Sequence, residues 1–134
     1  MIVVDSSIWI DHLRSTEQGL ASLLSSRRVL MHPFVLGEIA LGNFTQRREL
    51  ISNLSRLREA PVASHEELLA FVEGERLFGA GIGYVDAHLL ASTRLLPGAY
   101  IWTRDKRLAA VADRMGIAIP TNRSPRSPTE RLKQ

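Results

Sequence analysis

Short apolar runs alternate with longer amphipathic segments along this chain of 134 residues. A short run without polar residues is typical of a strand buried on both faces, and apolar residues spaced three or four apart are typical of a helix. The runs predict strands at 2–4, 29–31, 61–62, 100–103 and 117–119. The amphipathic segments predict a first helix that ends at 13 and further helices at 17–25, 34–41, 46–58, 65–78, 84–95 and 105–115. Strands that alternate with helices indicate an α/β fold, here a three-layer α/β/α arrangement with a central parallel sheet.

The predicted elements carry two expectations about single side chains. Ser6 and Ser7 follow the first strand, and serine is a favoured N-cap, so either one can begin the first helix. In the helix predicted at 65–78, the apolar spacing turns Leu68, Leu69, Val72 and Phe78 toward the core.

The composition is that of one globular domain and excludes several kinds of chemistry. The chain has no cysteine, which excludes a disulfide, a thiolate zinc site and a cysteine nucleophile. No run approaches the ~20 apolar residues that span a bilayer. The first residues also lack the basic and apolar segments of a signal peptide. We therefore expect a cytoplasmic protein without a membrane partner.

The net charge of +3 is unevenly distributed. Residues 1–120 carry 13 basic and 13 acidic side chains, so the excess lies in residues 121–134, which hold four basic groups and one acid. This division predicts one domain at 1–120 and a basic, flexible C-terminal tail at 121–134. The tail could contact nucleic acid, but such charged segments are most often only solvated.

Two acids directly follow predicted strands, at the sheet edge where parallel folds form their sites. Asp5 follows the first strand, and the neighbouring serines leave it free of a capping role. Asp105 lies in Thr103-Arg104-Asp105 after the strand at 100–103, where capping of the next helix is an equally good explanation.

Two further acids lie on predicted helices. Glu38 has apolar residues three and four positions away on both sides, so it is expected within an apolar stripe. A buried arginine partner is the alternative explanation for Glu38. Asp86 lies in the first turn of its helix, where the helix dipole alone would favour an anion. Clustered carboxylates repel one another, and a divalent cation with oxygen ligands would relieve that repulsion. Such an ion can act on a phosphodiester.

Other polar residues have ordinary explanations. The four histidines are expected in structural or surface roles, and the glycines at 79–83 form a loop that does not follow a strand, as a phosphate cradle would. Paired arginines such as Arg27-Arg28 are usually solvated. Arg104, Lys106 and Arg107 flank Asp105 and could hold RNA phosphates if the site is a nuclease.

The ordered set of motifs resembles the PIN-domain ribonucleases. The motifs are Val-Val-Asp-Ser-Ser at the start, a helical Glu38, Tyr-Val-Asp-Ala-His at 84–88 and Trp-Thr-Arg-Asp-Lys-Arg-Leu at 102–108. The length and the start are similar to those of VapC toxins from bacterial toxin–antitoxin pairs, and the resemblance extends over about residues 1–119. It implies a PIN-like fold, and an endoribonuclease toxin that a cognate VapB-type antitoxin neutralises. It further implies a homodimer, with higher assembly on antitoxin binding.

The same resemblance implies the site residues and the cofactor. Asp5, Glu38, Asp86 and Asp105 match the catalytic and metal-binding acids, with Mg²⁺ or Mn²⁺ as the ion. Thr103 and Ser6 match supporting polar positions near that ion.

Three alternatives belong to other functional classes. A non-catalytic RNA-binding or protein-interaction module would have no need for all four acids. A phosphate-accepting receiver domain would have further acids before Asp5, where the chain has Met1-Ile2-Val3-Val4. A dehalogenase-like phosphatase would have a second aspartate at position 7, where Ser7 stands.

Overall fold

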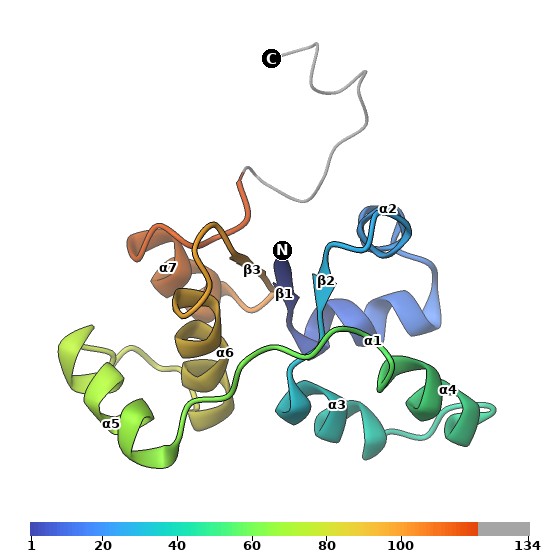
Figure 1. The fold of residues 1–134 in the computed structure, drawn as a ribbon, viewed down its shortest axis with the longest axis horizontal. Helices are drawn as coiled ribbons and strands as arrows, with labels where there is room; N and C mark the ends of the chain where they lie inside the picture. Colours follow the sequence, from blue (N-terminus) through green and yellow to red (C-terminus); the bar gives the residue numbers. More distant parts are fainter. Residues whose placement is uncertain (121–134) are drawn as a thin grey trace, which may run out of the picture.

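The computed structural model describes residues 1–120, and a three-stranded parallel sheet lies at their centre (Figure 1). The strand order is β2-β1-β3. The strands are β1 (Ile2–Val4), β2 (Val29–Leu30) and β3 (Tyr100–Trp102). Ile2 is in register with Val29 on one side and with Tyr100 on the other. Because all three strands run the same way, the residues after them meet at one edge of the sheet.

At the two outer strands of the sheet the structure differs from the prediction, and each side has only a single bridge. Ala118 pairs with Ile101, so the strand predicted at 117–119 contributes one bridge. The strand predicted at 61–62 is wrong, because the bridge to Met31 forms at Glu59 instead. Pro61 has no backbone N–H to donate, whereas the N–H of Ala60 donates to the carbonyl of Met31 over 3.0 Å.

Seven helices connect and cover the strands within the described residues. They are α1 (Ser6–Arg14), α2 (Gln18–Ser25), α3 (Pro33–Ala40), α4 (Arg47–Leu54), α5 (His65–Gly74), α6 (Tyr84–Arg94) and α7 (Lys106–Arg114). Figure 1 shows α1 to α4 on one side of the sheet and α5 to α7 on the other. The α/β/α prediction is therefore confirmed, and each predicted helix is present, although α4 and α5 end about a turn earlier than the pattern indicated.

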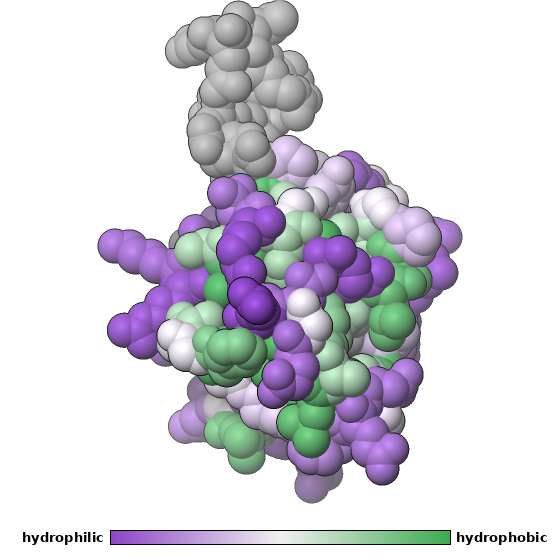
Figure 2. Space-filling view, turned by 90° about the vertical axis from the view of Figure 1, so that its left-hand side faces the viewer, coloured by the Kyte–Doolittle hydropathy of each residue, from purple (hydrophilic) through white to green (hydrophobic). Residues whose placement is uncertain are grey.

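The core is formed by the strands and by the inward faces of the helices, and α6 is its most buried helix. In α5 only Leu68 is fully buried. The inward placement of Leu69 and Phe78 is wrong, since they are 50% and 61% exposed. Phe78 lies beyond the end of α5, so helical spacing does not apply to it. Figure 2, which looks onto the side of the molecule formed by α5 to α7, shows hydrophobic side chains scattered among hydrophilic ones.

No helix in the described part of the chain is long and apolar enough to cross a bilayer. The basic tail predicted at 121–134 lies outside the described residues.

Candidate functional site

Asp5 is the most enclosed of the four acids, at only 6% exposed. It is itself the N-cap of α1, because its Oδ1 accepts a hydrogen bond of 2.8 Å from the backbone N–H of Ser6. The helix begins at Ser6, but the expectation that a serine is its N-cap, leaving Asp5 without a capping role, is wrong. Aspartate is as favourable an N-cap as serine. Because Asp5 directly follows β1 and directly precedes α1, it occupies the N-cap position.

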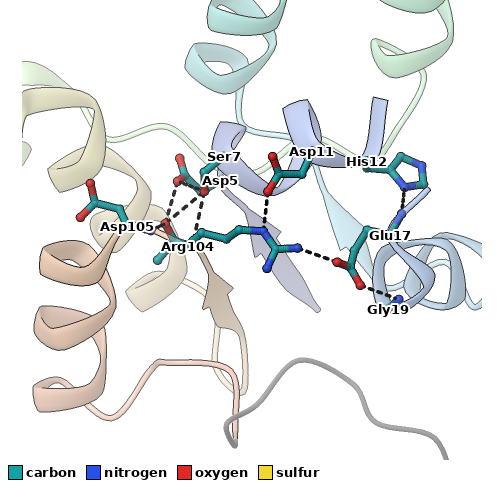
Figure 3. Close-up of polar contacts among 9 residues, drawn as sticks. Asp5, Ser7, Asp11, His12, Glu17, Gly19, Arg104 and Asp105 are labelled. Carbon is teal, nitrogen blue, oxygen red and sulfur yellow. Dashed lines mark hydrogen bonds and ion pairs between the residues drawn. The ribbon is translucent and has the colours of Figure 1, made fainter. Parts of the chain in front are cut away.

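Two hydroxyl groups hold the other oxygen of Asp5. Ser7 Oγ donates to Asp5 Oδ2 over 2.8 Å, and Thr103 Oγ1 donates to the same oxygen over 2.7 Å. The N–H of Arg104 in turn donates to Ser7 Oγ. Figure 3 shows these bonds joining the end of β3 to the start of α1. The Asp5 carboxylate is thus fixed by residues almost 100 positions apart in the sequence.

The remaining acids lie at the starts of α6 and α7 and on α3. Asp86 Oδ2 accepts a hydrogen bond of 3.2 Å from the N–H of Gly83. Asp105 is the N-cap of α7, with its Oδ1 accepting from the N–H of Leu108 over 2.9 Å. The capping explanation for Asp105 is therefore correct, and its second oxygen has no hydrogen bond within residues 1–120.

Glu38 is exposed, and its placement within an apolar stripe is wrong. The core face of α3 is formed by Val35 and Ile39, whereas Leu41 is 90% exposed. Sequence spacing shows which residues share a helix face but not which face is covered. No ion pair involves Glu38 within the described part of the chain, so the buried arginine partner has no support there.

The shifted pKa values of Glu38 and Asp86 indicate that the acids act on one another electrostatically. Partial burial raises the pKa of Glu38, and the charge of Asp5 and then that of Asp86 add to the rise, while Ser6 opposes it. Partial burial also raises the pKa of Asp86, with the Gly83 N–H opposing and the charges of Asp5 and Asp105 adding. Carboxylates from four separate elements therefore repel one another at the carboxyl edge of the sheet.

These oxygens are the ligand type that Mg²⁺ and Mn²⁺ prefer. None of the four acids has a cationic partner among the ion pairs of residues 1–120. The side chains as placed do not form a closed site, because no three acidic or histidine residues in the described range lie close enough to share an ion. The chemistry of the donors fits a hard divalent ion, although at least three of these side chains would have to move closer together to share one.

Arg104 has another role besides its proximity to Asp105. Its Nε lies 2.6 Å from Asp11 Oδ2, and its Nη2 lies 2.5 Å from Glu17 Oε2 (Figure 3). The guanidinium thus joins the turn before α7 to α1 and α2. Contact of Arg104 with RNA stays a prediction that would require it to leave these carboxylates. Lys106 and Arg107 are exposed and have no ion pair within the described residues.

Sequence analysis missed a partly buried aromatic cluster between α3 and α6. Four aromatic rings form a chain of contacts, in the order His32, Phe34, His88 and Tyr84. The centroids of neighbouring rings are 4.7–5.0 Å apart. His32 caps α3 through Nδ1, which accepts from the N–H of Phe34 over 3.0 Å. His32 Nε2 and both ring nitrogens of His88 are buried without a hydrogen-bond partner in residues 1–120. The cluster fixes the two helices that carry Glu38 and Asp86. The sequence did contain a signal for this N-cap, because a proline such as Pro33 is favoured at the first position of a helix and His32 directly precedes it.

Comparison with known proteins places this geometry in a family context. The family described as PIN domain matches residues 2–114. Ribonuclease VapC32 of Mycobacterium tuberculosis, from strain CDC 1551 / Oshkosh and from strain ATCC 25618 / H37Rv, is 45% identical over 119 residues. The aligned region covers 89% of this chain and 96% of each relative.

Proposed function

Because this chain belongs to the PIN-domain family and is similar to a VapC-type ribonuclease over most of its length, we propose that it is an endoribonuclease. The observation that carries the proposal is the placement of Asp5, Asp86 and Asp105 at or near the starts of helices, and of Glu38 on α3, toward the carboxyl edge of the sheet, where neighbouring acids help to raise the pKa of Glu38 and of Asp86. An enzyme that cleaves RNA must bring a phosphodiester to this acidic edge, where the charges would otherwise repel it. A divalent ion resolves that conflict.

The four carboxylates are the residues that would hold Mg²⁺ or Mn²⁺. Such an ion activates water and neutralises charge on the phosphate during in-line displacement. The chain's own part is to position the acids. Ser7 and Thr103 donate to Asp5 Oδ2 and keep its carboxylate oriented. Lys106 and Arg107, on the adjoining turn of α7, are candidates for contact with the RNA backbone.

Incubation with total cellular RNA tests this function. We expect new RNA ends with Mg²⁺ or Mn²⁺, and a loss of cleavage when a chelator removes the ion, because the acids alone repel the substrate. The ends should be mapped to show that the cuts are internal. Cleavage that continues at the same rate in excess chelator would contradict a metal-dependent enzyme, and absence of cleavage with either ion on every RNA tested would contradict the nuclease function.

We also propose that a VapB-type antitoxin inhibits the enzyme by placing an arginine among the four acids. A guanidinium fork pairs with carboxylates, and here it would occupy the oxygens that would otherwise hold a metal. Antitoxin and metal should then weaken each other's binding. The toxin is expected to be a homodimer, which light scattering would check.

The measurement is antitoxin affinity at increasing Mn²⁺ concentration, with Asp86→Asn as the control for general salt screening. Wild type should lose affinity more steeply than the control. The same dependence in both proteins would show that the inhibitor does not use the acids.

A further inference from the structure

A pocket of about 450 Å³ lies at the opposite end of the sheet from the acids. Its lining includes Val29, the first residue of β2, whereas Asp5 follows the last residue of β1. Three apolar side chains and three arginines line it: Leu24, Val29, Leu57, Arg27, Arg56 and Arg58. A cavity of this size is in the range of small-molecule sites, and it combines an apolar surface with a few charged groups as such sites do.

The three arginines of this pocket lack acidic partners. No acid lines the pocket, and none of the three forms an ion pair within residues 1–120. Within the described part of the chain, their side chains make one polar contact, a 3.5 Å approach of Arg56 to the amide oxygen of Asn53. Arg104, by contrast, contacts two carboxylates. Three guanidinium groups around one cavity repel each other, and a bound anion would relieve that repulsion.

Arg27 also adopts an unfavourable backbone conformation. Its φ is +56°, in the left-handed region at the C-terminal end of α2. Glycine or asparagine is the usual residue at such a position, because a larger side chain is strained there. Gln46 and Arg76 share this conformation, but Arg27 is the one whose side chain lines the pocket. A strained residue is a reason to look for a function of its side chain.

We propose that this arginine pocket binds a nucleoside phosphate, from a free nucleotide or from an RNA strand. Guanidinium groups bind phosphate oxygens in pairs and also stack on planar rings. Leu24, Val29 and Leu57 provide an apolar surface for the base. A purely inorganic anion would leave that surface uncovered. This inference does not depend on cleavage at the acid site, since the two sites lie at opposite ends of the sheet.

Calorimetry on the full chain, with chelator present, would test the proposal. Chelator prevents a metal from recruiting phosphates to the acids, so any binding is to basic groups. The probes are guanosine and adenosine diphosphates, pyrophosphate, a 5′-phosphorylated RNA trinucleotide and a glutamate-rich peptide. We expect Arg27→Gly and Arg58→Gln each to weaken nucleotide binding about tenfold or more, the effect of losing a charge-assisted contact.

The control is Arg48→Gln, an arginine on α4 that is exposed, as the three pocket arginines are, but does not line the pocket. Its affinity should stay within about twofold of wild type, since only general charge attraction is lost. Arg27→Gly should melt at the same or a higher temperature than wild type, because glycine tolerates the left-handed conformation. If Arg27→Gly is at least as stable as wild type but binds the nucleotides less tightly, the side chain of Arg27 has a role in binding and not in stability.

The probes also distinguish the sources. Tight binding of the diphosphates indicates a free nucleotide, whereas binding of the trinucleotide alone indicates an RNA strand, and both support the site. The proposal is overturned if pyrophosphate or the acidic peptide binds as tightly as the nucleotides. It is equally overturned if no probe binds at millimolar concentration, or if Arg48→Gln weakens binding as much as Arg27→Gly.

Discussion

Replacing Asp86 with asparagine is expected to lower kcat for RNA cleavage about a thousandfold. Loss of one metal-binding carboxylate removes several kcal/mol of transition-state stabilisation, and each 1.36 kcal/mol corresponds to about tenfold in rate. The fold should be retained, because the amide oxygen of asparagine can still accept the Gly83 N–H. The melting temperature should stay the same or rise, since a charge that Asp5 and Asp105 disfavour is removed.

The matched control is Asp113→Asn, an exposed acid on α7 that the structure does not place with the cluster. Its activity should stay within about twofold of wild type, because only a distant, solvated charge is changed. Cleavage rates at saturating metal and thermal melts should be measured on the same preparations. Near-normal cleavage by Asp86→Asn, or an equal loss in Asp113→Asn, would contradict the proposed role.

Asp5 is a less suitable position for this test. Its carboxylate accepts hydrogen bonds from the N–H of Ser6 and from the hydroxyls of Ser7 and Thr103. Asparagine provides one oxygen, so part of this network would lose its acceptor, at a cost of about 1–3 kcal/mol for each buried group left unpaired. A loss of activity in Asp5→Asn would therefore combine chemistry with local unfolding.

The protein is expected to lose about 2 kcal/mol of unfolding free energy between pH 7 and pH 4.5 through His32 alone. Burial, and secondarily the charge of His88, lowers the pKa of His32 to about 4. The unfolded chain has the ordinary value of 6.5, so below that pH it binds a proton that the folded protein excludes. This contribution is complete above pH 6.5 and is lost as the pH falls from 6.5 toward 4.

Urea unfolding at several pH values would measure this loss. His32→Asn is the control, because asparagine keeps an N-cap acceptor but does not titrate. The variant should be less stable at neutral pH and should lose less stability on acidification than wild type. The pKa values of Glu38 and Asp86 are raised and that of His88 is lowered, but these groups are present in both proteins. The same pH dependence in wild type and variant would show that His32 is not the group responsible.

Local patterns were sufficient to predict most of the fold. Runs such as 2–4 and 100–103 are apolar because both faces of a central parallel strand are covered, so the strand signal is strong. The edges are less predictable: the apolar run at 117–119 indicated the segment that bridges at Ala118, but the bridge at Glu59 depends on the neighbouring strand and has no local signal. The ends of α4 and α5 were less predictable, because amphipathic spacing continued beyond the last helical residue.

The sequence singled out four acids as a candidate site, which stays a prediction, but it could not show the contacts that position them. Strand ends and motif order indicated Asp5, Asp86 and Asp105. The hydrogen bond from Thr103 to Asp5 and the ion pairs of Arg104 join residues that only the fold brings together. Glu38 was identified from a resemblance and from its apolar neighbours, but the structure shows Glu38 itself to be solvent-exposed.

Anomalous scattering from Mn²⁺ in crystals of the protein is the most direct test of the metal site. A peak is expected among the carboxylates of Asp5, Glu38, Asp86 and Asp105, with the side chains moved closer together than in the structure without metal. The peak should weaken or vanish in Asp86→Asn at the same Mn²⁺ concentration. A crystal that is soaked at a concentration sustaining RNA cleavage and shows no ion at these four acids, or an ion bound only elsewhere, would contradict the proposed site.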